Sequence, residues 1–148
     1  MEVRLPLIGK LMSYNRYMEN YVYYSELLKP SWAPPSWIFG PVWTVLYVII
    51  IISFGFVLFK YIKKQYKTGI FLPFFLNALF NVLFTPIQFG LKNNFLASIN
   101  ILLVLGTLIW AMKAIWPRAR WVALVNIPYL AWVSFATVLQ LTITALNW

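Results

Sequence analysis

Aromatic side chains at helical spacing are the part of this chain that could form a chemical site. Residues three or four apart share one face of a helix, and two segments place aromatic or small apolar side chains in this way. Their members are Phe39, Trp43 and Tyr47 in the first segment, and Trp132, Ala136 and Leu139 in the second. Indole and phenyl faces can stack on a flat apolar ligand. The competing interpretation is that the tryptophans only pack helices together or anchor them at a membrane interface.

Two polar stripes run at similar spacing. One consists of Asn77, Asn81, Thr85 and Gln88, and the other of Asn126, Tyr129, Thr137, Gln140 and Thr144, with Asn100 able to bridge to either. Polar groups in a membrane helix turn towards the interior of the bundle, because lipid offers them no hydrogen bonds. There they either join neighbouring helices or contact a ligand, and the sequence leaves both roles open.

The residue types that most enzymes use for catalysis are missing. The chain has no Cys, no His and no Asp, and its only carboxylate side chains belong to Glu2, Glu19 and Glu26. Histidine-based triads, thiolate nucleophiles and the common zinc, iron and haem ligand sets are therefore excluded, and no metal site is expected. Proton-driven carriers usually have a carboxylate or a histidine within the bilayer, so the composition disfavours that class.

The elements that must position these residues are transmembrane helices. The chain of 148 residues is 62% hydrophobic and only 10% charged, with a formal net charge of +9. A helix needs about 20 apolar residues to cross a bilayer, and long apolar runs without alternation favour helices over barrel strands. We expect an all-α integral membrane protein with spans at about 36–59, 69–90, 94–116 and 121–146.

The N-terminal segment and the prolines modify this pattern. Residues 5–24 are long enough to span, but they contain Lys10 and Glu19, and each charge costs about 2.5–3.5 kcal/mol at a helix centre. They predict either an atypical first span or an amphipathic helix at the membrane interface. Pro86 and Pro128 lie within predicted helices and should bend them locally.

Basic residues between the spans predict the orientation. Seven of them lie in loops 60–67 and 113–120, whereas the loops of the opposite side contain only Lys29 and Lys92. The positive-inside rule places loops 60–67 and 113–120 in the cytoplasm and the C-terminus on the opposite side. If the N-terminal segment spans, its basic residues join the same side, which favours five spans over four. Because the basic residues fall between apolar segments, nucleic acid is not an expected partner.

One stretch has a specific signature. Residues 29–47 read KPSWAPPSWIFGPVWTVLY, which resembles the first loop and second helix of the TspO/translocator-protein family, also called tryptophan-rich sensory proteins or peripheral-type benzodiazepine receptors. The likeness continues at Asn81 and at Phe89-Gly90. It returns at 128–139 as PYLAWVSFATVL.

The resemblance implies a single domain over 1–148. This domain would be a five-transmembrane-helix bundle with an atypical first span, around an internal pocket that the long first loop, about 24–36, covers as a lid. Family members bind protoporphyrin IX and related tetrapyrroles, sterols in animals and benzodiazepine-type drugs, and some bacterial members are reported to degrade bound porphyrin under light. Transport roles have also been proposed for the family.

The implied function is a membrane receptor or sensor for tetrapyrroles, with no required cofactor and with membrane lipid as a partner. A small-molecule carrier for porphyrin is the alternative, which the polar stripes and the helix-bending prolines favour. A dimeric scaffold is a third interpretation. Family members often dimerise, but no GxxxG pair in this chain supports a homodimer independently.

The expected ligand-binding residues combine the aromatic faces with the resemblance. They are Trp32, Trp37, Phe39, Trp43, Tyr47, Asn81, Phe84, Gln88, Trp132, Ala136 and Leu139. The resemblance assigns Trp43, Trp132 and Ala136 to the pocket, and any photochemistry of bound porphyrin would involve the two tryptophans. Trp32 and Trp37 flank two consecutive prolines, which predicts a stiff lid, with a plain interfacial loop as the alternative.

The chain departs from the family pattern at three positions. Phe84 replaces the usual tryptophan after the asparagine motif of the third helix, Gln88 replaces the first Phe of a Phe-Phe-Gly, and Gln140 replaces the usual Asn. The end of the last helix lacks the tyrosine and basic residue of the sterol-recognition pattern. Sterol binding by that route is therefore not expected.

Overall fold

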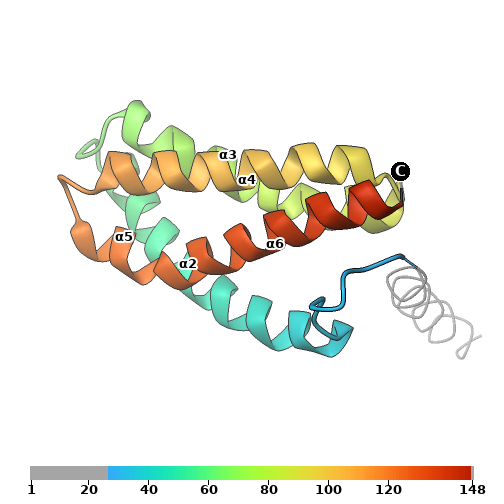
Figure 1. The fold of residues 1–148 in the computed structure, drawn as a ribbon. Helices are drawn as coiled ribbons and strands as arrows, with labels where there is room; N and C mark the ends of the chain where they lie inside the picture. Colours follow the sequence, from blue (N-terminus) through green and yellow to red (C-terminus); the bar gives the residue numbers. More distant parts are fainter. Residues whose placement is uncertain (1–26, 148) are drawn as a thin grey trace, which may run out of the picture.

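The computed structural model describes residues 27–147, and every regular element in that range is a helix (Figure 1). In chain order the elements are η1 (Ser36–Ile38), α2 (Phe39–Ile62), α3 (Thr68–Thr85), the π-helical turn η2 (Pro86–Gly90), α4 (Asn94–Ile115), α5 (Arg120–Val125) and α6 (Ile127–Leu146). The expected first span at 5–24 lies outside the described residues.

Four segments among the described residues are long and apolar enough to cross a membrane. They are Ser36–Ile62, Thr68–Gly90, Asn94–Ile115 and Ile127–Leu146. Their outer faces carry large apolar side chains such as Ile51, which is 71% exposed, and a surface of this kind is stable against lipid rather than water. The expected all-helical membrane architecture is confirmed for these four segments, and the fifth span stays a prediction.

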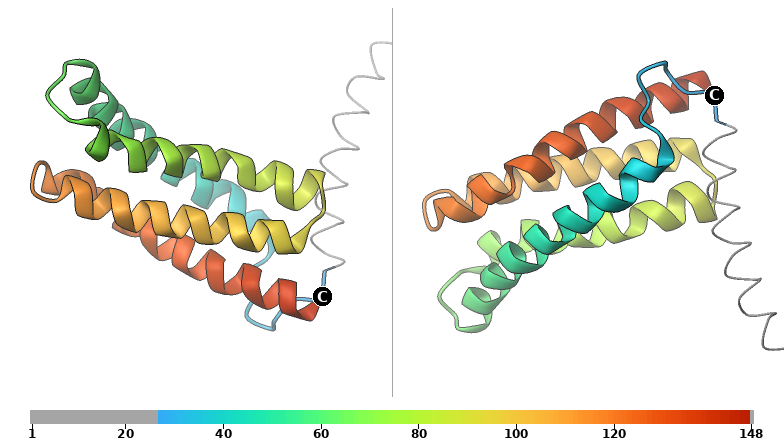
Figure 2. Two further views of the ribbon diagram at one scale, coloured as in Figure 1. Left: turned by 90° about the horizontal axis from the view of Figure 1, so that it is seen from above. Right: turned by 90° about the horizontal axis from the view of Figure 1, so that it is seen from below.

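The bundle is built around α4. Helices α3 and α4 form an antiparallel hairpin, and α6 packs along another side of α4 (Figures 1 and 2). Helix α2 crosses the other three at an angle. One end of α2 packs beside α3 and α5, whereas its Phe39 end stands away from α6 in Figure 1.

Prolines interrupt two spans close to where the sequence predicts bends. Pro86 has no N–H for the preceding turn, so α3 ends at Thr85 and the chain continues as a π turn, in which Leu91 N donates to Pro86 O at 3.0 Å. The segment 121–146, expected as one bent helix, is divided into α5 and α6 at Asn126, two residues before Pro128. Both interruptions lie where proline leaves the helix without a backbone donor.

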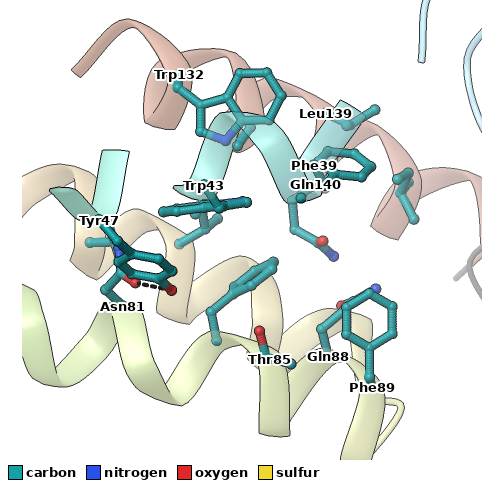
Figure 3. Close-up of a pocket in the computed structure, with 16 residues that line it drawn as sticks. Phe39, Trp43, Tyr47, Asn81, Thr85, Gln88, Phe89, Trp132, Leu139 and Gln140 are labelled. Carbon is teal, nitrogen blue, oxygen red and sulfur yellow. Dashed lines mark hydrogen bonds between the residues drawn. The ribbon is translucent and has the colours of Figure 1, made fainter. Parts of the chain in front are cut away.

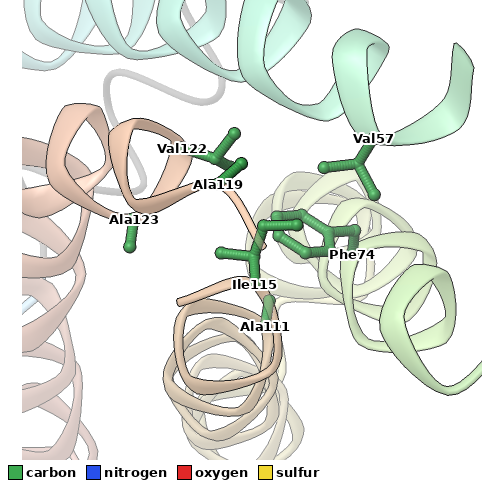
Figure 4. Close-up of a cluster of buried hydrophobic side chains, with 7 residues drawn as sticks. All are labelled: Val57, Phe74, Ala111, Ile115, Ala119, Val122 and Ala123. Atoms are coloured by element: carbon green, nitrogen blue, oxygen red, sulfur yellow. The ribbon is translucent and has the colours of Figure 1, made fainter. Parts of the chain in front are cut away.

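Two apolar clusters fill the interior. One joins α2, α3, α4 and α5 close to the turn between α2 and α3, and consists of Val57, Phe74, Ala111, Ile115, Ala119, Val122 and Ala123 (Figure 4). Its three alanines allow the helices to approach closely. The other lies between α2, α4 and α6 and consists of Leu46, Ile101, Val104, Leu108, Tyr129 and Val133. Ile101 and Val104 of this second cluster also line a cavity.

Candidate ligand-binding site

A cavity of about 330 Å³ lies between α2, α3, η2, α4 and α6 (Figure 3). Sites for small molecules typically enclose roughly 300–1,000 Å³. The lining residues are Phe39, Gly40, Trp43, Tyr47, Asn81, Phe84, Thr85, Gln88, Phe89, Ile101, Val104, Trp132, Ala136, Leu139, Gln140 and Ile143. Because five elements contribute side chains, the cavity exists only when the bundle is assembled.

The structure brings nine of the eleven predicted ligand-binding residues to this cavity. They are Phe39, Trp43, Tyr47, Asn81, Phe84, Gln88, Trp132, Ala136 and Leu139. It does not bring Trp32 or Trp37 there. The ring of Trp32 meets Phe135 edge-on at 5.8 Å between centroids, and Trp37 is 72% exposed. Trp32 lies in the first loop and Trp37 in η1, and neither is part of the lining.

Seven lining residues were not among the predicted ones. They are Gly40, Thr85, Phe89, Ile101, Val104, Gln140 and Ile143. Thr85 and Gln140 belong to the two polar stripes, so the sequence contained a signal for them. Val104 lies four residues after Asn100 and three before Thr107, so these two polar residues mark its face of α4 as inward. Only the packing of the bundle shows that this inward face, with Ile101 beside it, borders a cavity.

Aromatic rings line the cavity from several sides. Trp43 lies 5.5 Å from the Tyr47 ring at an interplanar angle of 33°, and both rings come from α2. Across the cavity, Trp132 of α6 meets Phe39 edge-on at 5.8 Å. Trp43 also contacts the buried Tyr129 ring at 6.4 Å. Aromatic surfaces therefore face the cavity from both α2 and α6 (Figure 3).

A chain of hydrogen bonds fixes the wall between α2, α3 and α6. The Tyr47 hydroxyl donates to Asn81 Oδ1 at 3.1 Å, and Asn81 Nδ2 donates to the Tyr129 hydroxyl at 2.7 Å. That hydroxyl donates in turn to Asn77 Oδ1 at 2.9 Å, and Asn77 Nδ2 donates to Val104 O at 2.9 Å. Asn77 is thus a packing residue, whereas Asn81 both joins helices and lines the cavity.

A second polar group closes the opposite end. Gln88 Nε2 donates to Asn94 Oδ1 at 3.1 Å, and Gln140 Nε2 donates to Thr144 Oγ1 at 3.2 Å. Thr144 Oγ1 donates to Asn94 O at 3.0 Å, and it lies 2.6 Å from Ser98 Oγ. These bonds hold η2, the start of α4 and the end of α6 together at the end where Gln88 and Gln140 line the cavity.

Two cavity residues keep an unsatisfied polar atom. Trp132 Nε1 and Gln88 Oε1 are both buried and have no hydrogen-bond partner within the described part of the chain. No acidic or basic side chain belongs to the lining. Within residues 27–147 no group of three His, Cys, Asp or Glu side chains comes together to hold a metal ion. The cavity is therefore suited to aromatic stacking and to neutral hydrogen bonds.

The first loop is fastened to the end of α6. Asn147 Oδ1 accepts from Leu28 N at 3.0 Å, and Asn147 Nδ2 donates to Leu28 O at 2.9 Å. The contact between Trp32 and Phe135 attaches the same loop further along α6. The loop consequently follows α6, the helix that supplies Trp132 and Ala136 to the cavity.

These features define an integral, multi-pass helical membrane protein with an internal aromatic cavity. The chain belongs to the TspO/MBR family, whose sequence profile it matches over residues 3–146.

Individual relatives agree with this assignment. The chain is 39% identical over 125 residues to the tryptophan-rich protein TspO of Bacillus cereus, covering 84% of this chain and 80% of the relative. It is 35% identical over 126 residues to the tryptophan-rich protein TspO of Chlorobaculum tepidum, covering 84% and 79%. Similarity extends to the human translocator protein, at 32% identity over 124 residues, covering 80% of this chain and 70% of the human protein.

Proposed function

We propose that this protein is a membrane receptor that binds a tetrapyrrole such as protoporphyrin IX in the cavity. The observation that carries the proposal is that Trp43 and Trp132, from different helices, line one cavity without charged side chains. Membership of the family supports it, and one relative, from Cereibacter sphaeroides, is named a tryptophan-rich sensory protein.

The uncharged lining determines how such a ligand would sit. The macrocycle gains stacking and burial against the indole rings. Its carboxylates stay at the mouth of the cavity, because burying a carboxylate without a cation or sufficient donors costs several kcal/mol. A neutral or apolar edge of the ligand therefore enters first.

Titration of tryptophan fluorescence tests this proposal. The purified full-length protein in detergent is expected to show saturable quenching by protoporphyrin IX at micromolar or lower concentration. Trp132→Ala should weaken this binding about tenfold, since a stacked pair of aromatic rings contributes about 0.5–1.5 kcal/mol beyond area burial. Trp116→Ala is the matched control, because Trp116 lies outside the cavity, under the guanidinium of Arg120. Quenching that never saturates, or that is equal in all three proteins, would overturn the proposal.

A photochemical role for Trp43 and Trp132 is the second part of the proposal. Both indoles line the cavity in which the chromophore would be excited. In aerated buffer, illumination should bleach the absorbance of bound porphyrin faster in the wild type than in Trp43→Phe or Trp132→Phe, with no change in the dark. Equal bleaching of all three proteins, at equal porphyrin occupancy, would remove this part and leave the receptor proposal in place.

A porphyrin carrier is the alternative function. The interruptions at Pro86 and Asn126 favour it, because transporters often use broken helices beside their binding sites. Counterflow of labelled porphyrin in proteoliposomes separates the two functions. Flux above that of empty vesicles supports a carrier, and saturable binding without such flux supports a receptor.

We also propose five spans, with loops 60–67 and 113–120 in the cytoplasm. The chain has no cysteine, so single cysteines at Val3, Gln65 and Ser31 can be labelled from one side of the membrane without background. Five spans with this orientation predict that Val3 and Gln65 react from the cytoplasmic side and Ser31 from the opposite side. Reaction of Val3 from the same side as Ser31 would show that the segment 5–24 does not cross.

The lid and the dimer are further proposals. The two bonds between Leu28 and Asn147 support a lid, since they fasten the first loop beside the cavity-lining helix. Asn147→Ala should therefore speed the release of bound porphyrin in stopped-flow measurements. A homodimer stays a prediction that mass measurement in lipid nanodiscs can test.

A further inference from the structure

The two unsatisfied polar atoms of the cavity differ in kind. Trp132 Nε1 is a donor without an acceptor, and Gln88 Oε1 is an acceptor without a donor. Both residues line the same cavity, and Gln88 is only 3% exposed. Because buried polar groups are nearly always hydrogen-bonded, each unsatisfied atom in a cavity wall marks a group that a ligand can complete.

The local structure holds the free oxygen of Gln88 in place. Pro86 forces the π turn, which carries Gln88 at its centre, and π turns within α-helical segments are frequent at functional sites. The amide nitrogen of Gln88 is already bonded to Asn94 Oδ1 at the start of α4. That bond leaves the oxygen as the free end of a restrained side chain, so little conformational entropy is lost when a ligand binds it.

We propose that the cavity selects flat ligands that bring an uncharged hydrogen-bond donor to Gln88 Oε1 and an acceptor to Trp132 Nε1. Hydroxyl and amide N–H groups are the donors of this class, and ether, carbonyl and ring-nitrogen atoms are the acceptors. The inference rests on the proposed function and deepens it, because it names the polar groups that make the cavity bind one tetrapyrrole more tightly than another.

The charge distribution explains why the donor is uncharged. An ammonium group beside Gln88 would need a carboxylate, but none of the lining residues is acidic, and the last carboxylate side chain in the sequence belongs to Glu26. A buried unpaired cation is strongly unfavourable. A hydroxyl or amide group satisfies the same oxygen without that cost.

Two porphyrins that differ only in their donors test the inference. Haematoporphyrin dimethyl ester carries two hydroxyethyl groups, and its di-O-methyl ether keeps the oxygens but has no peripheral donor. The full-length wild-type protein in detergent should bind the hydroxylated ester about tenfold more tightly, because a buried acceptor left unsatisfied is costly. This comparison needs no variant, so it remains decisive whatever a substitution does to folding.

Variants then assign the effect to a residue. Gln88→Met keeps the volume of the side chain but removes the acceptor, and should abolish the preference for the hydroxylated ester. Trp132→Phe keeps an aromatic ring without the donor, and should weaken both esters while the preference remains. Gln65→Met is the matched control, because Gln65 lies outside the cavity and accepts from Lys60.

The outcomes separate this inference from the proposed function. Saturable binding of both esters with equal affinity, or a preference that survives Gln88→Met, overturns the inference and leaves tetrapyrrole binding intact. Absence of saturable binding for both esters and for protoporphyrin IX overturns the proposed function, and the inference falls with it.

Discussion

Individual polar residues in this bundle serve two purposes. Tyr129 is completely buried, and its hydroxyl joins Asn77 and Asn81 of the facing helix. Asn81 in turn holds the Tyr47 hydroxyl at the cavity wall. The polar stripe of α3 is therefore neither purely packing nor purely a ligand surface, because the same hydrogen bonds that join the helices also orient a cavity residue.

Tyr129→Phe tests this coupling at the residue scale. The substitution leaves Asn81 Nδ2 and Asn77 Oδ1 without a partner, and we expect it to lower the free energy of unfolding by about 1–2 kcal/mol. Unfolding in mixed detergent micelles measures the change. Tyr61→Phe is the control, because the Tyr61 ring stacks on Phe71 at 4.3 Å and its hydroxyl has no hydrogen bond among the described residues. Equal stability of the two variants would contradict the expectation.

At the scale of elements, the prolines decide where cavity side chains stand. A regular helix beyond Thr85 would rotate each following residue by about 100°, whereas the π turn at 86–90 inserts one residue into that rotation. Gln88 and Phe89 of this turn both line the cavity. The π turn therefore places Gln88 and Phe89 in the lining, whereas a regular continuation of α3 would point these side chains in other directions.

Pro86→Ala should remove the ligand preference of the cavity while thermal stability rises or stays equal. The new N–H can bond the carbonyl of the preceding turn, so α3 can continue and thermal stability in detergent should rise or stay equal. The reoriented Gln88 should lose the preference for a hydroxylated porphyrin over its methyl ether, measured by fluorescence titration. A variant that keeps the wild-type preference would show that the π turn does not position Gln88.

At the scale of the molecule, the cavity results from uneven packing. Helix α4 is sandwiched between α3 and α6, while α2 diverges from α6 towards Phe39 (Figure 1). The apolar clusters close the remainder of the interior, including the end shown in Figure 4. The bundle therefore has one end that is filled by apolar side chains and another that holds a cavity.

Filling the cavity should abolish binding without unfolding the protein. Ala136→Phe places a ring inside the lining, and we expect porphyrin affinity to fall more than tenfold while the unfolding temperature changes little. Ala131→Phe is the matched control, because Ala131 is exposed on the outer face of the same helix. Unchanged affinity in Ala136→Phe, checked by equilibrium titration, would place the ligand elsewhere.

The sequence alone was sufficient to predict the class of protein and nine of the residues that line the cavity. Lipid cannot satisfy backbone groups, so apolar length predicts helices directly. The four-residue spacing of Phe39, Trp43 and Tyr47 predicts a shared face, because spacing on one helix is a local property. The sequence therefore predicts the cavity residues that share one helix face, such as Phe39, Trp43 and Tyr47.

Only the tertiary structure decided which faces meet. Ile101 and Val104 line the cavity, and Trp32 and Trp37 do not. Local sequence does not decide these cases, because an inward face of α4 can either pack against a helix or border a cavity, and Trp32 and Trp37 both belong to the family signature. The free atoms of Gln88 and Trp132 are also a tertiary property, since a hydrogen bond is left unmade only after every neighbouring helix is in place.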